Sequence, residues 1–160
     1  MILVWQNNFG ISKKAAKVYI DQYLEEYSGI KRYMETVVEE ATKNGYAKTL
    51  FGRRRYIKEL SSSNYMVREF GKRAAMNTPI QGTAADIMKI AMIKVYKELK
   101  LNKLKAKIVL QVHDEMMIEA PIEEKEFVKK IIKESMESAT PLCIPLIAEI
   151  SEATTWYDCK

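Results

Sequence analysis

The most informative stretch of the chain reads Lys107-Ile-Val-Leu-Gln-Val-His-Asp-Glu-Met-Met-Ile-Glu-Ala120. Residues 107–112 alternate, with Ile108, Leu110 and Val112 on one side, and residues 116–120 form a second short apolar run. Both runs are typical of β-strands. Because only two or three residues around His113 and Asp114 separate them, the pattern predicts a tight antiparallel hairpin that Pro121 ends.

The segments before and after this predicted hairpin show the residue spacing of α-helices. Apolar residues recur every three or four positions from Lys13 to Tyr27, after Ser12 as a helix-capping residue, and again from Ile30 to Asn44, before Gly45. The spacing further predicts a hairpin or extended loop at 46–57, helices at 65–77 and 84–99 separated by Pro79, a helix at 123–139 and a final strand at 146–150. The expected fold class is α+β: an antiparallel sheet packed against long helices, with two additional N-terminal helices.

Two sets of side chains are expected to pack in the interior. The apolar face of the helix at 123–139 predicts burial for Phe127, Val128, Ile131, Ile132 and Met136. The tyrosines at positions 19, 23, 27 and 33 recur at helical spacing, which favours core or half-buried packing over a platform for stacking bases.

Composition narrows the function classes only modestly. Lys plus Arg outnumber Asp plus Glu by 26 to 21, and the net charge of +5 permits a nucleic-acid partner without requiring one. Cys143 and Cys159 are far apart and show no zinc-type spacing. No apolar run is long enough for a membrane span, so the sequence predicts a reduced, soluble, cytoplasmic protein.

The polar tip of the predicted hairpin is the first candidate site. A carboxylate held at a rigid turn suits a hard cation such as Mg²⁺, which prefers oxygen ligands. An ordinary polar turn is the alternative, because Asp is common in turns. A His-Asp metal phosphohydrolase needs several histidines, and His113 is the single histidine of the chain, so the count argues against that class.

A second candidate is the row Arg73, Asn77 and Gln81. Residues four apart share one side of a helix, and these three can donate to the acceptors that every base pair presents in the minor groove. A helix packed by its polar residues explains the same spacing. Arg53, Arg54 and Arg55 could bind phosphates or form a solvated basic turn.

Three runs in order resemble the family A DNA polymerases, those of the DNA polymerase I type. They are Thr49-Leu-Phe-Gly-Arg-Arg-Arg-Tyr56, Arg73 to Asp86, and Leu110-Gln-Val-His-Asp-Glu115, and the closing Thr155-Trp-Tyr157 also fits. The likeness extends from about Asn8 to Lys160. It implies that residues 1–45 correspond to the latter part of the polymerase fingers and residues 46–160 to the carboxyl-terminal portion of the palm.

The resemblance also implies roles for single residues. Asp114 corresponds to one of two aspartates that bind two catalytic Mg²⁺ ions, and Glu115 to the accessory catalytic carboxylate beside it. Gln111 and His113 correspond to contacts near the primer terminus. The row at positions 73, 77 and 81 corresponds to contacts with the minor groove and the template. Arg53 and Arg55 complete the expected DNA-binding set.

Two elements of the family are missing from the chain. The first is the earlier metal-binding motif of the form Asp-Tyr-Ser-Gln-Ile-Glu, and the second is the helix that grips the incoming nucleotide. We therefore expect a fragment whose parent binds primer-template DNA and deoxynucleoside triphosphates, with an incomplete Mg²⁺ site and no activity of its own. A non-catalytic DNA-binding remnant or accessory module is the alternative, and a phage-type RNA polymerase fragment fits the runs less well. Surfaces exposed by truncation predict self-association.

Overall fold

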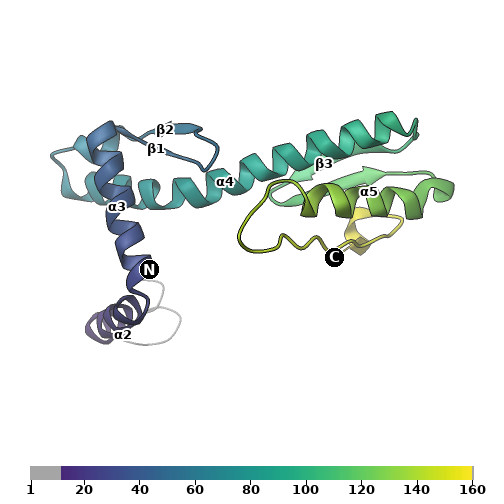
Figure 1. Cartoon of the computed structure of the whole chain (residues 1–160). Helices are drawn as coiled ribbons and strands as arrows, with labels where there is room; N and C mark the ends of the chain where they lie inside the picture. The colour runs from purple at the N-terminus through teal and green to yellow at the C-terminus, as the bar shows by residue number, and fades with distance from the viewer. Residues whose placement is uncertain (1–11, 160) are drawn as a thin grey trace. The chain divides into compact units, whose positions relative to one another are not determined.

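The computed structural model describes residues 12–159, which form two compact units (Figure 1). One unit comprises residues up to 48 together with 52–79, and the other comprises residues 49–51 together with 80 onward. The residues before Ser12, which the sequence assigns to the first helical portion, lie outside the described range. The assignment of 1–45 and 46–160 to fingers and palm stays a prediction.

The first unit is built from helices and a small hairpin. Helix α2 spans Lys13–Glu26 and begins at Ser12, whose hydroxyl accepts from the Ala15 N–H at 3.2 Å. Helix α3 spans Ser28–Asn44 and ends at Gly45, whose φ of 76° is left-handed. Strands β1 (Tyr46–Lys48) and β2 (Arg54–Tyr56) form an antiparallel hairpin, followed by the 3₁₀ helix η1 (Lys58–Ser61). The predicted caps and the predicted hairpin are confirmed.

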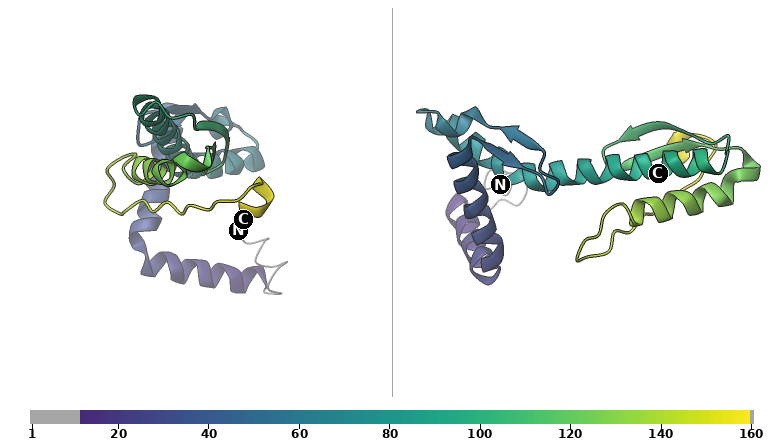
Figure 2. Two further views of the ribbon diagram at one scale, coloured as in Figure 1. Left: turned by 90° about the vertical axis from the view of Figure 1, so that its right-hand side faces the viewer. Right: turned by 45° about the horizontal axis from the view of Figure 1, so that its top comes forward.

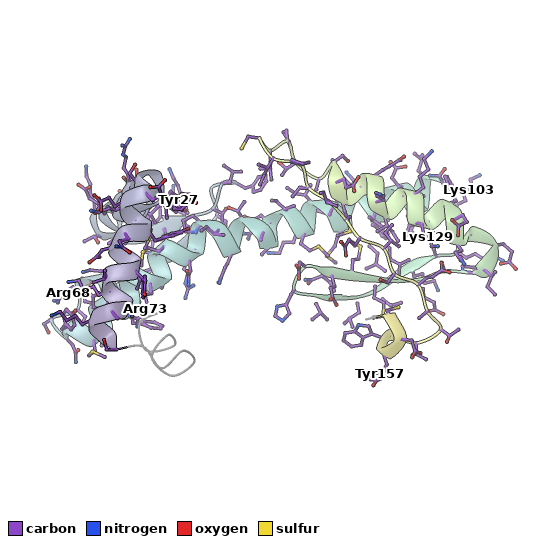
Figure 3. The ribbon with its side chains drawn as sticks, turned by 90° about the horizontal axis from the view of Figure 1, so that it is seen from below. Tyr27, Arg68, Arg73, Lys103, Lys129 and Tyr157 are labelled. Carbon is purple, nitrogen blue, oxygen red and sulfur yellow. The ribbon has the colours of Figure 1, made fainter. Side chains whose placement is uncertain are left out.

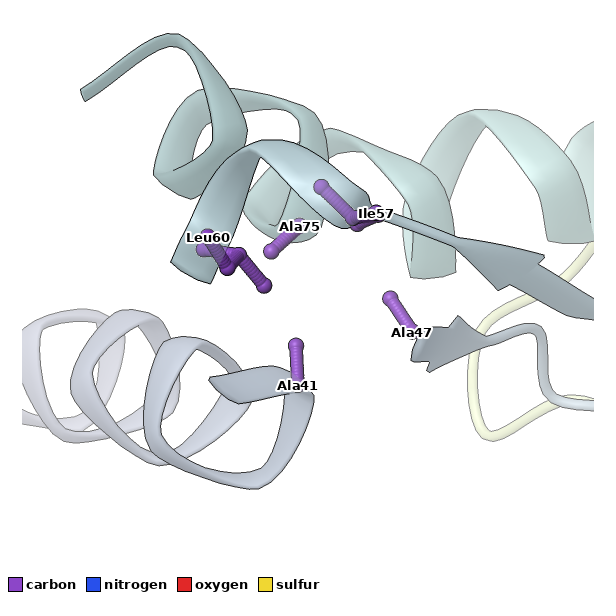
Figure 4. Packing of buried hydrophobic residues seen from close by; sticks show 5 residues of the cluster. All are labelled: Ala41, Ala47, Ile57, Leu60 and Ala75. Carbon is purple, nitrogen blue, oxygen red and sulfur yellow. The ribbon is translucent and has the colours of Figure 1, made fainter. Parts of the chain in front are cut away.

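A compact apolar cluster holds this unit together (Figure 4). It joins Ala41 of α3, Ala47 of β1, Ile57, Leu60 of η1 and Ala75 of α4, all buried. Gly71 lies against η1 so closely that a Cβ would come within 2.9 Å of the Leu60 nitrogen. Small side chains are therefore what allows α4 to approach η1.

Helix α4 spans Tyr65–Leu101, so the prediction that Pro79 separates two helices is wrong. A proline inside a helix removes one hydrogen bond and costs roughly 3 kcal/mol. The helix continues because residues on both sides of the proline are buried. Ala75 is buried in the first unit, and Met88 and Val95 are buried in the second. Asn64 caps its start by accepting from the Met66 N–H at 2.9 Å.

The second unit contains the predicted central hairpin. Strand β3 (Lys107–Val112) pairs with β4 (Glu115–Glu119) in antiparallel register, and the 3₁₀ helix η2 (Ile122–Glu124) leads into α5 (Lys125–Glu137). Figure 2 shows α5 and the carboxyl-terminal half of α4 with the hairpin beside them. One apolar cluster joins all of these elements: Val95, Leu99, Leu104, Ala106, Ile108, Met116, Ile118, Ala120, Val128, Ile131 and Ile132.

The alternation predicted for β3 breaks at Val109. The register shifts between Ile108 and Leu110, so that Ile108 faces the core while Leu110 is 40% exposed. An unpaired residue of this kind is a β-bulge, which bends the strand and changes which side chains face inward. Period-two reading of a sequence cannot detect it.

Two further expectations for this fold are wrong, and one on the tyrosines holds. Residues 146–150 form no strand, because no described strand pairs with them; the Ala148 N–H instead donates to Glu137 Oε1 of α5 at 3.2 Å. Phe127 is 45% exposed, because the core-facing line of α5 runs through Val128 and Ile131. The tyrosines at 19, 23 and 27 are about half exposed, which agrees with the half-buried packing expected for them, whereas Ala16 of α2 is fully buried.

The carboxyl-terminal segment is tied to α5 by charge. Glu152 accepts from Lys125 Nζ at 2.6 Å and also pairs with Lys129. Lys129 is labelled on α5 in Figure 3. A short 3₁₀ helix, η3 (Trp156–Cys159), follows. Among the described residues, no helix is long and apolar enough to cross a membrane, and both cysteines are free.

Candidate functional site

The tip of the β3–β4 hairpin gathers four of the predicted site residues. His113 and Asp114 form a two-residue turn between Val112 and Glu115, which are register partners. His113 has a left-handed φ of 51°, and its carbonyl accepts from Gln111 Nε2 at 2.6 Å. Gln111, His113, Asp114 and Glu115 are all exposed. The backbone of the turn is thus held by the ladder and by Gln111, while its charged groups face solvent.

The left-handed His113 is an unusual choice for this turn. Residues other than glycine rarely adopt positive φ, although His does so more often than most. Such conformations cost of order 1–3 kcal/mol and persist where the surroundings enforce them, often at functional sites. Gly is the residue that would relieve the cost, so the imidazole at this position lowers local stability.

The carboxylates of this turn fit a divalent ion in part. Asp114 and Glu115 supply oxygen donors of the kind that hard cations prefer. Within residues 12–159, however, no group of three or more His, Cys, Asp or Glu side chains is placed to hold a metal ion. The incomplete Mg²⁺ site expected from the sequence stays a prediction.

The predicted donor row lies on α4 and is open to solvent. Arg73, Asn77 and Gln81 are all exposed, the first two in the first unit and Gln81 in the second. The Arg73 guanidinium lies over the Phe70 ring, 5.9 Å from its centroid. Stacking of this kind restricts a long side chain without using its hydrogen-bond donors. The exposure of the three side chains fits the donor row, and the contact of Arg73 with Phe70 fits the alternative of packing by polar residues.

The basic stretch lies on the first hairpin. Arg53 follows Gly52, whose φ is 82°, and Arg54 and Arg55 lie in β2. The Arg54 guanidinium stacks on the Tyr46 ring at 4.8 Å from the centroid. Arg55 is exposed and is the register partner of Ala47. Alternation along the strand therefore sends Arg54 and Arg55 to opposite faces of the hairpin.

Sequence reasoning missed a buried polar group in the second unit. The Thr49 hydroxyl donates to Asp86 Oδ2 at 2.8 Å, and the Leu50 N–H donates to Thr83 Oγ1 at 2.9 Å. Thr49 and Asp86 are 5% and 4% exposed. The signal was present as small residues at 82–85 beside an acidic residue on an otherwise apolar helical face, but nothing in the spacing pointed to Thr49 as the partner.

Comparison with known proteins identifies the family. The model of the family described as DNA polymerase family A matches residues 4–158. This chain belongs to the family A DNA polymerases. It is 53% identical over 150 residues to DNA polymerase I of Caldicellulosiruptor bescii and 52% identical over 153 residues to that of Bacillus subtilis. These matches cover 94% and 96% of the chain but only 18% and 17% of the two relatives.

A solved family A structure shares the fold. The polymerase domain of Pol1 from M. smegmatis, in complex with DNA primer-template and dNTP, matches with a TM-score of 0.91 and 42% sequence identity. The match covers 96% of this chain and 27% of that one. Family A DNA polymerases use divalent metal ions, which agrees with the type of oxygen donor at the Asp114 turn.

Proposed function

We propose that this chain is the part of a template-directed DNA polymerase that contacts primer-template DNA and contributes Asp114 to the Mg²⁺ site. The observation that carries the proposal is the exposed His113-Asp114-Glu115 turn in a chain of this family. In this role Asp114 and Glu115 are the catalytic carboxylates, and Gln111 and His113 lie at the primer terminus. Residues 1–45 then correspond to the late fingers and 46–160 to the palm.

The DNA contacts follow from the exposed donors. Arg73, Asn77 and Gln81 contact the minor groove and template, where acceptors occur at every base pair and allow binding without sequence preference. Arg53 and Arg55 contact phosphates, which makes affinity fall as salt rises. The deoxynucleoside triphosphate is the second substrate of the whole enzyme. The cytoplasmic location stays a prediction.

The binding part of this proposal is tested by fluorescence anisotropy with a labelled primer-template duplex. We expect binding at low salt that weakens as salt rises, and a loss of roughly tenfold in Arg73→Ala, since one good polar contact is worth about 1–3 kcal/mol. Arg32→Ala, which removes an equally exposed arginine from α3, is the matched control. No binding at low salt, or equal losses in both variants, would contradict the proposal.

The chemical part is tested by primer extension with Mg²⁺ and all four deoxynucleotides. Because the described residues hold no cluster of three metal-binding side chains, we expect no extension by this chain alone. Extension that disappears in Asp114→Asn would show a complete site and overturn this expectation. A non-catalytic DNA-binding module predicts the same binding result, so a reading frame that continues upstream through the missing aspartate motif would decide between the two.

A further inference from the structure

A buried clamp joins residues 49–51 to one turn of α4 within the second unit. Two hydrogen bonds form it, from the Thr49 hydroxyl to Asp86 and from the Leu50 N–H to the Thr83 hydroxyl. Gln81, one of the proposed DNA contacts, lies two residues before Thr83, on the other side of Gly82. The clamp therefore fixes the backbone from which Gln81 extends.

Gly82 makes the clamp possible. A Cβ at this position would lie 2.6 Å from Thr49 Cγ2, closer than real Cβ contacts, and the next nearest atom would be Thr49 Cβ at 3.9 Å. The Thr49 methyl thus occupies the space that any other residue at position 82 would fill. The clash involves one methyl group and nothing else within 3.9 Å, so shortening Thr49 to serine would remove it.

The clamp buries a carboxylate, which costs more free energy than an apolar contact at the same place would. Burying a carboxylate carries a desolvation penalty, and replacing buried polar pairs by apolar residues is often neutral or stabilising. A hydrogen-bonded pair has a property that an apolar contact lacks, because it fixes direction as well as distance. Asp86 and Thr49 are 4% and 5% exposed, so this directional contact is shielded from water.

We propose that Thr49, Gly82, Thr83 and Asp86 position Gln81 for its contact with DNA, acting through the backbone of α4. The inference rests on the proposed function. It assigns no contact with DNA to the four residues themselves, which makes them positioning residues. Their effect on DNA binding should therefore exist only while the Gln81 side chain is present.

The test compares primer-template affinity among variants that circular dichroism shows to be folded. We expect Gly82→Ala to weaken binding about fivefold to tenfold, comparable to loss of the Gln81 contact itself. Gly82→Ala combined with Thr49→Ser should recover to within about twofold of the unaltered chain. Gly29→Ala, at a helical glycine with no atom within 4 Å of the added Cβ, is the control and should not change affinity.

The Gln81→Ala background separates positioning from general damage. In that background Gly82→Ala should cause no further loss, because the group that the clamp positions is gone; additive losses would overturn the inference, as would unchanged binding by Gly82→Ala alone. If Gly82→Ala does not fold, Thr49→Val removes the hydroxyl at nearly constant volume and is held to the same outcomes. Failure of the unaltered chain to bind DNA would instead overturn the proposed function.

Discussion

At the scale of the residue, Gly29 within α3 and Gly45 at its C-terminal cap provide a matched pair. Neither Gly29 nor Gly45 has an atom within 4 Å of an added Cβ, but only Gly45 has a left-handed φ, of 76°. We expect Gly45→Ala to lower the free energy of unfolding by about 1–2 kcal/mol. Gly29→Ala should leave it unchanged or raise it by up to about 1 kcal/mol. Urea unfolding of both variants checks this, and equal effects would show that φ is not the cause.

Single residues also show which parts of the candidate site can be predicted from the sequence. The position of Asp114 at an exposed hairpin tip could be predicted, because a polar tip between two apolar strands is a local pattern. The shared helix and exposure of Arg73, Asn77 and Gln81 could be predicted because helical spacing is also local, while the roles of all these residues stay predictions. Thr49 and Asp86 are 37 positions apart, and their partnership depends on how a hairpin loop meets a helix. The spacing of residues within either segment therefore does not predict the hydrogen bond between Thr49 and Asp86.

At the scale of the element, the segment after α5 depends on charge. Hydrogen bonds from Lys125, and to a smaller extent from Lys129, lower the pKa of the Glu152 carboxyl. The hydrogen bonds that Lys129 donates to Glu152 and Glu126 raise the pKa of its ammonium group. Because the carboxyl pKa is lowered, the ionised Glu152 stabilises the contact at any pH above the usual glutamate pKa of about 4.3. This stabilisation is lost as the pH falls through the lowered pKa. Because the lysine pKa is raised, the protonated Lys129 stabilises the contact at any pH below the usual lysine pKa of about 10.4. This stabilisation is lost as the pH rises through the raised pKa.

We therefore expect the segment to be held most firmly between about pH 5 and pH 10. Trp156, in a Trp5→Phe background that leaves it the single tryptophan, reports this through its emission. Glu152→Gln should flatten the acid and alkaline changes relative to Glu149→Gln, which removes an exposed carboxylate nearby in sequence. The Asp158 carboxylate, which accepts from the Thr155 hydroxyl, is present in both variants and therefore does not distinguish them. Identical profiles would contradict the assignment to Glu152.

Elements were predicted well where a local signal ends them. Ser12 starts α2 through its side-chain hydrogen bond and Gly45 ends α3 through its left-handed backbone, so both helix ends could be predicted from the sequence. Pro79 failed as a signal because burial on either side outweighs one missing hydrogen bond. Residues 146–150 failed for the opposite reason. Their sequence permits a strand, but a strand also requires a partner, and the described residues supply none.

At the scale of the whole molecule, exposed apolar surface on α2 and on Tyr27, the residue that follows it, bears on association. Val18, Tyr19, Tyr23 and Tyr27 are each about half exposed. Apolar surface of this kind favours contacts that remove it from water. The self-association expected from the sequence remains a prediction: light scattering should show an apparent mass that rises with concentration. Tyr23→Ser should reduce that rise more than Tyr157→Ser, which alters an isolated tyrosine that is 86% exposed. A constant monomer mass would contradict it.

The bulge at Val109 has a consequence for amide hydrogens in solution. In an antiparallel pair, alternate N–H groups point toward the neighbouring strand and the rest point outward. Since β3 and β4 form a sheet of two strands in the described part of the chain, the outward groups have no third strand to protect them. Deuterium uptake followed by NMR should therefore alternate between slow and fast along β3. At Val109 the alternation should slip by one residue, so that isotope exchange records the register of the hairpin.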